Sequence, residues 1–196
     1  YPLTSSISVD RYDEAFAGNK KKVLYALQNT FDHYTILSPH YAYGSSSATD
    51  WLKEKQKLNI ISIPSIFYGS SIQKGSVRLK YYVTGTLIAE ASDTLKNGLL
   101  TQTSGSTTGN SVGVVLYNEG FIVLTSSANI DTHGEAYGPG AGPVSASWHY
   151  FGVTSSYAGS PSSSFSLDFN GVNYVQTLTL FAHAKENQIN FSNNPT

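Results

Sequence analysis

Apolar and polar residues alternate along positions 76–83, and this pattern constrains the fold more than any other part of the sequence. Four apolar side chains share one face of the segment: Val77, Leu79, Tyr81 and Val83. Two cationic side chains share the other face: Arg78 and Lys80. A period of two residues is what an antiparallel strand with one buried face requires. Residues 76–83 are therefore predicted to form such a strand.

Turn signals on the C-terminal side of this segment indicate more strands of the same kind. Thr84-Gly85, Asn97-Gly98 and Asn118-Glu119-Gly120 each separate two runs rich in apolar and β-branched residues. Asn-Gly is a strong hairpin signal because both of its positions tolerate a positive φ angle. Between residues 60 and 125 the sequence therefore predicts a series of antiparallel strands joined by short turns.

A further hairpin is predicted at Asn170-Gly171. Apolar residues alternate with polar ones before this dipeptide: Phe165, Leu167 and Phe169. We expect a two-residue turn that joins a strand at Ser164–Phe169 to a strand at Val172–His183. The three alternating side chains should then share one buried face.

One substantial helix is predicted near the start of the chain, within residues 10–36. Apolar residues recur there at the spacing of one helix face: Val23, Leu24, Leu27, Phe31 and Tyr34. The helix is expected to begin at Asp10 or Asn19 and to end near Tyr34. Three members of the apolar face should point toward the core: Leu24, Leu27 and Phe31.

Together these elements predict an all-β fold, an antiparallel β-sandwich-like domain with one N-terminal α-helix. Residues 1–57 are assigned to an extended N-terminal arm, the helix and a loop. Residues 58–196 are assigned to the β-sandwich-like domain, as one continuous unit. Within that domain, residues 103–110 and 129–143 are expected to be loops and residues 147–151 a strand.

The composition argues against several classes of function. Charged residues make up 13% of the chain, and 12 Lys and Arg balance 13 Asp and Glu to give a net charge of −1. No overall field attracts nucleic acid or an anionic membrane, so neither is expected as a partner. Cysteine is absent, which excludes disulfides and thiolate chemistry.

No motif nominates a catalytic, cofactor-binding or metal-binding residue, and an enzyme is not expected. The five histidines are dispersed along the chain: His33, His40, His133, His149 and His183. Asp131, His133 and Glu135 lie at alternate positions in a Gly-rich stretch, where they are the nearest approach to a cation site. Their spacing is a weak metal signal and is more typical of a flexible polar loop.

Aromatic residues are a more informative group. Nine of them are candidates for stacking on sugar rings or for contacting a protein partner: Tyr41, Tyr43, Tyr68, Tyr81, Tyr82, Tyr137, Trp148, Tyr150 and Tyr157. The same residues also suit the interior and the ends of a sandwich, and we favour this packing role for most of them.

Short segments spread over nearly the whole chain carry a resemblance to a known family. They are Tyr1–Ile7, Leu37–Ala42, Ile63–Ile72, Lys74–Val77, Val115–Phe121, Phe181–Lys185 and Ser192–Thr196. In this order they resemble segments of large virion structural proteins of contractile-tailed marine bacteriophages. The ten-residue segment Ile63–Ile72 is the most specific. Residues 44–57 and 126–163 match no part of that family.

The resemblance implies a section of a longer virion structural protein in the tail or baseplate region, assembled in the host cytoplasm. Its partners are then other virion subunits, in a homo- or hetero-oligomeric assembly held by repeated contacts between β-domains. Residues 1–10, extended and polar, are expected to reach an adjacent subunit as an added strand. A head or neck position stays open. So does a different class, a carbohydrate-binding or adhesin module that binds a glycan at a host surface.

Overall fold

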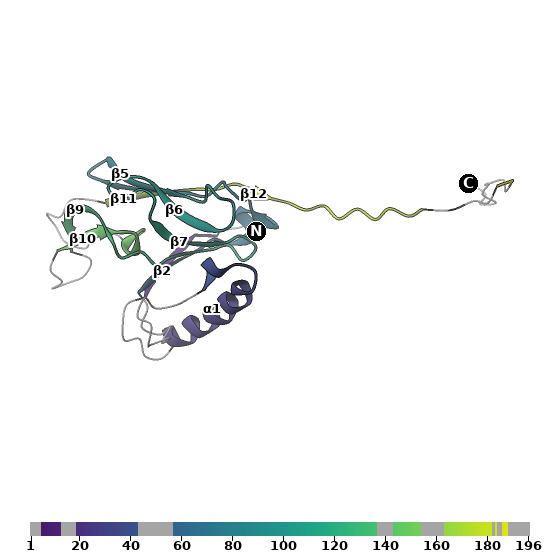
Figure 1. The fold of residues 1–196 in the computed structure, drawn as a ribbon, viewed down its shortest axis with the longest axis horizontal. Coiled ribbons are helices and arrows are strands. Elements are labelled where there is room, and N and C mark those ends of the chain that lie inside the picture. The colour runs from purple at the N-terminus through teal and green to yellow at the C-terminus, as the bar shows by residue number, and fades with distance from the viewer. Residues whose placement is uncertain are drawn as a thin grey trace.

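The computed structural model describes residues 5–12, 19–42, 57–136, 143–153, 163–181, 183 and 186–187. An antiparallel sheet of eight strands forms the centre of this part of the chain and curls around a core (Figure 1). In spatial order the strands are β1 (Ser8–Tyr12), β2 (Leu58–Ser62), β8 (Phe121–Leu124), β7 (Ser111–Leu116), β6 (Leu99–Ser104), β5 (Thr86–Ser92), β4 (Arg78–Val83) and β11 (Ser163–Asp168). Strands β4 to β8 are consecutive neighbours and form a meander, which β2, β1 and β11 extend at its two ends.

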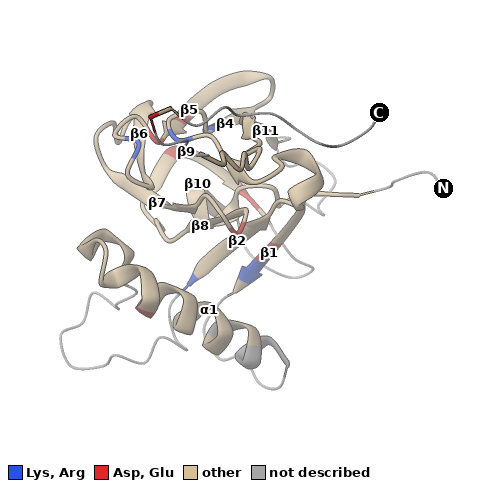
Figure 2. Ribbon diagram, turned by 90° about the vertical axis from the view of Figure 1, so that its right-hand side faces the viewer, with Lys and Arg blue, Asp and Glu red and all other residues tan. Residues whose placement is uncertain are grey.

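Two small sheets and one helix complete the described fold. β9 (Asn129–Glu135) pairs with β10 (Val144–Ser147), and β3 (Ser71–Ile72) pairs with β12 (Gly171–Val172). The single α-helix of the described residues, α1 (Asn19–Thr35), lies against the side of the sheet formed by β2, β7 and β8 (Figure 2). This arrangement confirms the predicted fold class, an all-β, antiparallel, sandwich-like domain with one N-terminal helix.

The curled sheet encloses the larger of two hydrophobic cores. The alternation of the first predicted strand is confirmed, since all four residues of its apolar face are buried: Val77, Leu79, Tyr81 and Val83. At the centre, the Tyr81 ring meets Trp148 edge to face with centroids 6.3 Å apart, and meets Phe165 at 4.7 Å. Such aromatic pairs stabilise a core by about 0.5–1.5 kcal/mol beyond the burial of their area.

α1 covers the opposite face of the sheet and forms the second core. Leu27 and Phe31 of the helix pack with Leu58, Leu116 and Val123, which come from β2, β7 and β8. The other faces of these strands meet the larger core. β2, β7 and β8 are therefore buried on both sides, and their near-continuous apolar sequences reflect it.

The predicted helix is confirmed, with its start at Asn19 and its end at Thr35. Leu27 and Phe31 point inward as expected, at 7% and 2% exposure. Val23, at the first position of the predicted apolar face, is 46% exposed. The side chain of Leu24 lies outside the described part of the chain.

Two of the predicted turns are tight connections between neighbouring strands. Thr84 and Gly85 have φ angles of 48° and 80°, as a two-residue type I′ hairpin requires, and Val83 pairs with Thr86 across it. The turn that ends at Gly120 joins β7 to β8, and the Gly120 N–H donates to the Leu116 carbonyl at 3.0 Å.

The predicted hairpin at Asn170-Gly171 is wrong. β11 pairs with β4, and Gly171 and Val172 pair with β3. A Cβ atom on Gly171 would lie 2.4 Å from the Tyr68 carbonyl oxygen, so this glycine serves a close approach of two backbones rather than a turn. Residues 173–181 form no strand and run away from the body of the molecule (Figure 1). The predicted shared face is nevertheless present, because the three alternating residues are half-buried against the larger core: Phe165, Leu167 and Phe169.

Three other local predictions are corrected by contacts that are distant in sequence. Residues 129–135, expected within a loop, form β9 because β10 supplies a pairing partner. Residues 148–150, expected within a strand, form a 3₁₀ turn in which Trp148 is fully buried. Residues 8–10, expected to reach a neighbouring subunit, belong to β1 and pair with β2 of the same chain.

Replacement of Leu27 by Ala tests the helix-covered core. We expect Leu27→Ala to lower the free energy of unfolding by about 2–5 kcal/mol, because it removes a buried side chain and leaves a cavity. Val23→Ala, on the exposed part of the same helix, is the matched control and should change stability by less than about 0.5 kcal/mol. Urea unfolding followed by circular dichroism measures both values. Equal losses for the two variants would contradict the described packing of α1.

Candidate functional site

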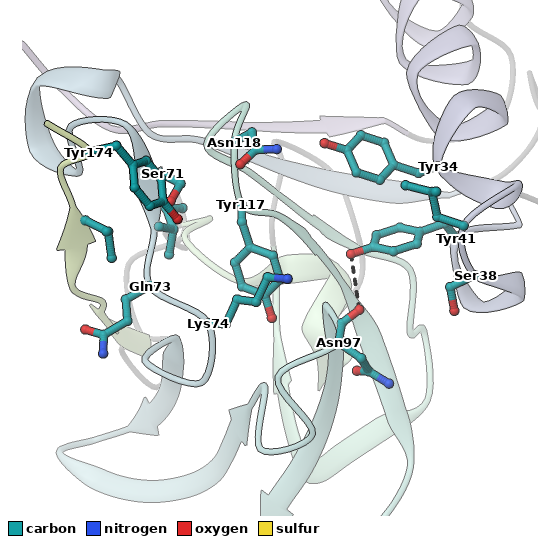
Figure 3. A pocket seen from close by; sticks show the side chains of 13 residues that line it. Tyr34, Ser38, Tyr41, Ser71, Gln73, Lys74, Asn97, Tyr117, Asn118 and Tyr174 are labelled. Atoms are coloured by element: carbon teal, nitrogen blue, oxygen red, sulfur yellow. Dashed lines mark hydrogen bonds between the residues drawn. The ribbon is translucent and has the colours of Figure 1, made fainter. Parts of the chain in front are cut away.

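A pocket of about 440 Å³ lies where the turn after α1 faces the loops that precede β4 and β6 and the turn between β7 and β8 (Figure 3). Four tyrosines line it: Tyr34, Tyr41, Tyr117 and Tyr174. Four longer polar side chains line it as well: Gln73, Lys74, Asn97 and Asn118. Aromatic rings beside amide groups and one cation give the pocket both apolar and hydrogen-bonding surface.

A buried carboxylate holds two of the pocket loops together. Asp93 is fully buried and accepts hydrogen bonds from the backbone N–H groups of Gly75 at 2.7 Å and Val77 at 3.0 Å. It also accepts one from the Tyr117 hydroxyl at 2.8 Å. Burial, and then the hydrogen bond to Asp93, raise the pKa of Tyr117 well above its ordinary value. Because these contacts link the β3–β4 and β5–β6 loops to the turn between β7 and β8, they fix one wall of the pocket.

The opposite wall is fixed by two tyrosines at and beyond the end of α1. The Tyr34 hydroxyl donates to the Glu119 carboxylate, whose two oxygens lie 2.7 and 2.9 Å away. The Tyr41 hydroxyl donates to the carbonyl of Val115 at 3.1 Å and lies 3.3 Å from that of Asn97. These bonds attach the helix end to the turn between β7 and β8 and to the loop before β6.

A glycine makes room for this attachment. Gly98 has a φ angle of 93°, and a Cβ atom there would lie 1.9 Å from the Tyr41 hydroxyl. The His40 Nε2 atom lies 2.7 Å from the Asn97 carbonyl and donates to it, which leaves Nδ1 to accept from Ser38 Oγ at 2.6 Å. The Asn97-Gly98 signal in the sequence therefore serves the pocket wall as well as the turn into β6.

The hydroxyl groups of Tyr34 and Tyr117 are held as neutral phenols, because each donates a hydrogen bond to a carboxylate. Burial, and then the hydrogen bond to Glu119, raise the pKa of Tyr34 to about 12. Neither group is therefore available as a base at neutral pH. The arrangement suits the binding of a neutral polar molecule, with rings for stacking and amides for hydrogen bonds.

A second candidate site is the exposed segment that follows β12. Its apolar side chains are between 73% and 94% exposed: Tyr174, Val175, Leu178, Leu180 and Phe181. Gln176, Thr177 and Thr179 separate them and give the segment the composition of a strand. Apolar side chains grouped in this way on a protein surface make the segment a candidate for contact with a partner.

Of the histidines and acidic residues considered as metal ligands, Asp131 and His133 are in contact, but no third ligand joins them among the described residues. The His133 Nδ1 atom lies 2.7 Å from an Asp131 oxygen. The hydrogen bonds from His133 lower the pKa of Asp131 despite the opposing effect of its burial. Glu135 is buried, and His149 is buried with its Nε2 atom 3.2 Å from the Tyr12 carbonyl. Within the described residues, no three His, Asp or Glu side chains converge as they would around a metal ion.

The structure describes six of the nine aromatic candidates, and they lie in the core, on the surface of the sheet or in the pocket. Three of them pack in the larger core: Tyr68, Tyr81 and Trp148. Tyr82 and Tyr150 are half-buried on the sheet and beside it, and Tyr41 alone of the nine lines the pocket. The other three lie outside the described residues: Tyr43, Tyr137 and Tyr157.

Sequence reasoning missed Tyr34, Tyr117 and Tyr174 as pocket residues. Tyr34 lies on the predicted helix and belongs to α1, whereas Tyr117, expected at the end of a strand, lies in the turn that follows β7. The only sequence signal for the pocket is that turn-forming residues follow Tyr117 and precede Leu99.

Comparison with known proteins does not add to this description. No protein-family model matches the chain, and no curated protein or solved structure matches it either. Among the described residues, no helix is both long enough and apolar enough to cross a membrane.

The raised pKa of Tyr34 predicts a loss of stability at alkaline pH. The fold favours the neutral phenol, so this contribution is complete below about pH 10, the ordinary pKa of tyrosine, and is lost as the pH rises toward about 12. In Tyr34→Phe the free energy of unfolding should fall less steeply over this interval, and the contribution of Tyr117 should remain. Urea unfolding at several pH values between 9 and 12 measures the slope. Tyr174→Phe, which removes an exposed hydroxyl, is the control, and an unchanged slope in Tyr34→Phe would contradict the prediction.

Proposed function

We propose that the chain is a structural subunit of a bacteriophage virion, assembled in the host cytoplasm into the tail or baseplate region through repeated contacts between β-domains. The resemblance to virion structural proteins supports the virion setting. The observation that carries the assembly role is the exposed apolar segment 174–181, because removing such side chains from water against a partner is favourable.

The sheet itself supports assembly in the same way. β1 and β11 lie at the two ends of the main sheet, and no described strand pairs with the outer side of β11. An open edge presents unpaired N–H and C=O groups that a strand of another chain can satisfy. A rigid domain with an apolar extension and an edge strand is the construction expected of a subunit in a repeating β assembly.

The oligomeric state tests this proposal. At micromolar concentration the chain should sediment as an assembly larger than a monomer, with interfaces that bury more than about 1,000 Å² each. Leu178→Asp combined with Leu180→Asp places two charges in the exposed segment and should shift the population toward monomer. Leu95→Asp adds a charge at another exposed leucine, in the β5–β6 loop, and is the matched control. A monomeric parent chain, or an equal effect of the control, would contradict the assembly role.

A second candidate function is carbohydrate binding at a host surface, and the tyrosine-lined pocket favours it. Tyr174 is exposed at the pocket rim and Asn118 lies across from it, which places a ring and an amide around the same space (Figure 3). Sugars are bound by this combination of aromatic surface and side-chain amides.

A glycan array tests the carbohydrate candidate. Binding should weaken about tenfold in Tyr174→Ala, which corresponds to about 1.4 kcal/mol, and should be unchanged in Leu95→Ala. Absence of binding to any glycan by the parent chain would exclude this second function and leave the assembly role unaffected.

A further inference from the structure

We propose that residues 175–181 add as a strand to the outer edge of β11 in a second copy of the chain. The inference rests on the proposed assembly role and names its partner surface. It follows from three features: the bonds that direct this segment away from its own sheet, the chemistry of the two strands at the ends of the sheet, and the alternation of side chains along both the segment and β11.

Backbone hydrogen bonds commit residues 170–174 to β3 and away from β11. The N–H of Val172 donates to the Tyr68 carbonyl at 3.0 Å, and the Ser70 N–H donates back to the Val172 carbonyl at 2.9 Å. The Tyr174 N–H donates to Ser70 Oγ at 3.1 Å. The Gln73 N–H donates to the Asn170 carbonyl at 2.8 Å.

These bonds have a direct consequence for the β11 edge. A hairpin at Asn170-Gly171 would bring residues 172–181 back along β11 of the same chain. The bonds to β3 prevent that return, because the backbone groups of residues 170–172 are already paired there. The segment therefore leaves the body at Tyr174, and no described part of the same chain pairs with the outer edge of its own β11.

Of the two strands at the ends of the sheet, β11 is the better acceptor. Its sequence, Ser-Ser-Phe-Ser-Leu-Asp, has no proline or lysine of the kind that protects natural edges. β1 carries Asp10 and Arg11, and Arg11 lies over the Tyr150 ring at 4.8 Å. The Tyr12 carbonyl at the end of β1 is 3.2 Å from His149. β1 thus carries two charges in its middle and contacts the 3₁₀ turn, whereas the one charge of β11 is Asp168 at its end, 3.6 Å from Lys80 of the neighbouring strand β4.

The side chains of the two strands alternate in a compatible way. β11 directs Phe165 and Leu167 toward the larger core, where both remain half-buried, and places Ser164 and Ser166 on its other face. In the exposed segment, Leu178 and Leu180 share one face, and the two threonines, Thr177 and Thr179, share the other with Val175 and Phe181. A shift of one residue exchanges the two faces of an added strand. In one of these two alignments the leucines lie on the same face as Phe165 and Leu167 and extend it, and the threonines lie on the same face as the serines of β11.

Strand addition of this kind joins a donor segment on one copy to an acceptor edge on the next. The two surfaces differ, so the contact is heterologous and each copy has one of each. Such a contact repeats until it closes into a ring, or continues as a filament. Both outcomes are forms of a repeating virion assembly.

Disulfide trapping between two single-cysteine variants tests the proposal, because the parent chain has no cysteine of its own. Full-length Ser166→Cys is mixed with Thr177→Cys or with Thr179→Cys and oxidised. A mixed dimer on a non-reducing gel is expected for at least one pair, since directly opposed strand residues meet the distance that a disulfide needs. Circular dichroism verifies that each variant is folded.

Two controls define the register and the edge. Ser166→Cys with Leu178→Cys should give about tenfold less mixed dimer, because Leu178 lies on the opposite face of the added strand. Ser8→Cys on β1 with Thr177→Cys tests the other edge. If the chain assembles but Thr177→Cys joins Ser8→Cys in preference to Ser166→Cys, the β11 assignment is overturned and the assembly role stands. If the chain is monomeric and no pair is trapped, both are overturned.

Discussion

Strands β2, β7 and β8 are buried on both faces, and the other parts of the fold are placed where they satisfy that requirement. The curled sheet covers one face and α1 covers the other, so the helix is a structural layer. A polar group buried in these strands needs its partners inside the protein. The Nδ2 group of Asn59 in β2 shows this, because it donates to the carbonyls of His149 and Phe151 and holds the 3₁₀ turn against the sheet, although Asn59 Oδ1 has no hydrogen-bond partner among the described residues.

The local part of the fold could be predicted from the sequence, because it depends on residues that are neighbours in the chain. The alternation at residues 77–83 and the turn at Thr84-Gly85 specify a strand and a hairpin without outside help. At Asn170-Gly171 the local signal is equally strong, yet Gly171 and Val172 pair with β3 and no hairpin forms there. This pairing depends on where Tyr68 lies in space, which no local pattern reveals.

The pocket was beyond sequence prediction for a related reason. Tyr34 and Tyr117 are separated by 83 positions, and each has an ordinary place in its own element. They face one space only because α1 packs against β7 and β8 and because buried Asp93 fixes the loops around Tyr117. The absence of catalytic motifs in the sequence is compatible with such a site, since binding needs rings and amides but no activated nucleophile.

The position of Tyr174 has a consequence for regulation. This residue lines the pocket and is also the last residue tied to β3 before the exposed segment begins. A molecule in the pocket and a neighbouring subunit that receives the segment would therefore act on the same short stretch of backbone. If a bound molecule contacts Tyr174 differently when the segment is free and when it is held by a neighbour, the two equilibria are coupled, and the coupling is reciprocal. Occupancy of the pocket would then change the free energy of subunit addition, and subunit addition would change the affinity of the pocket by the same factor.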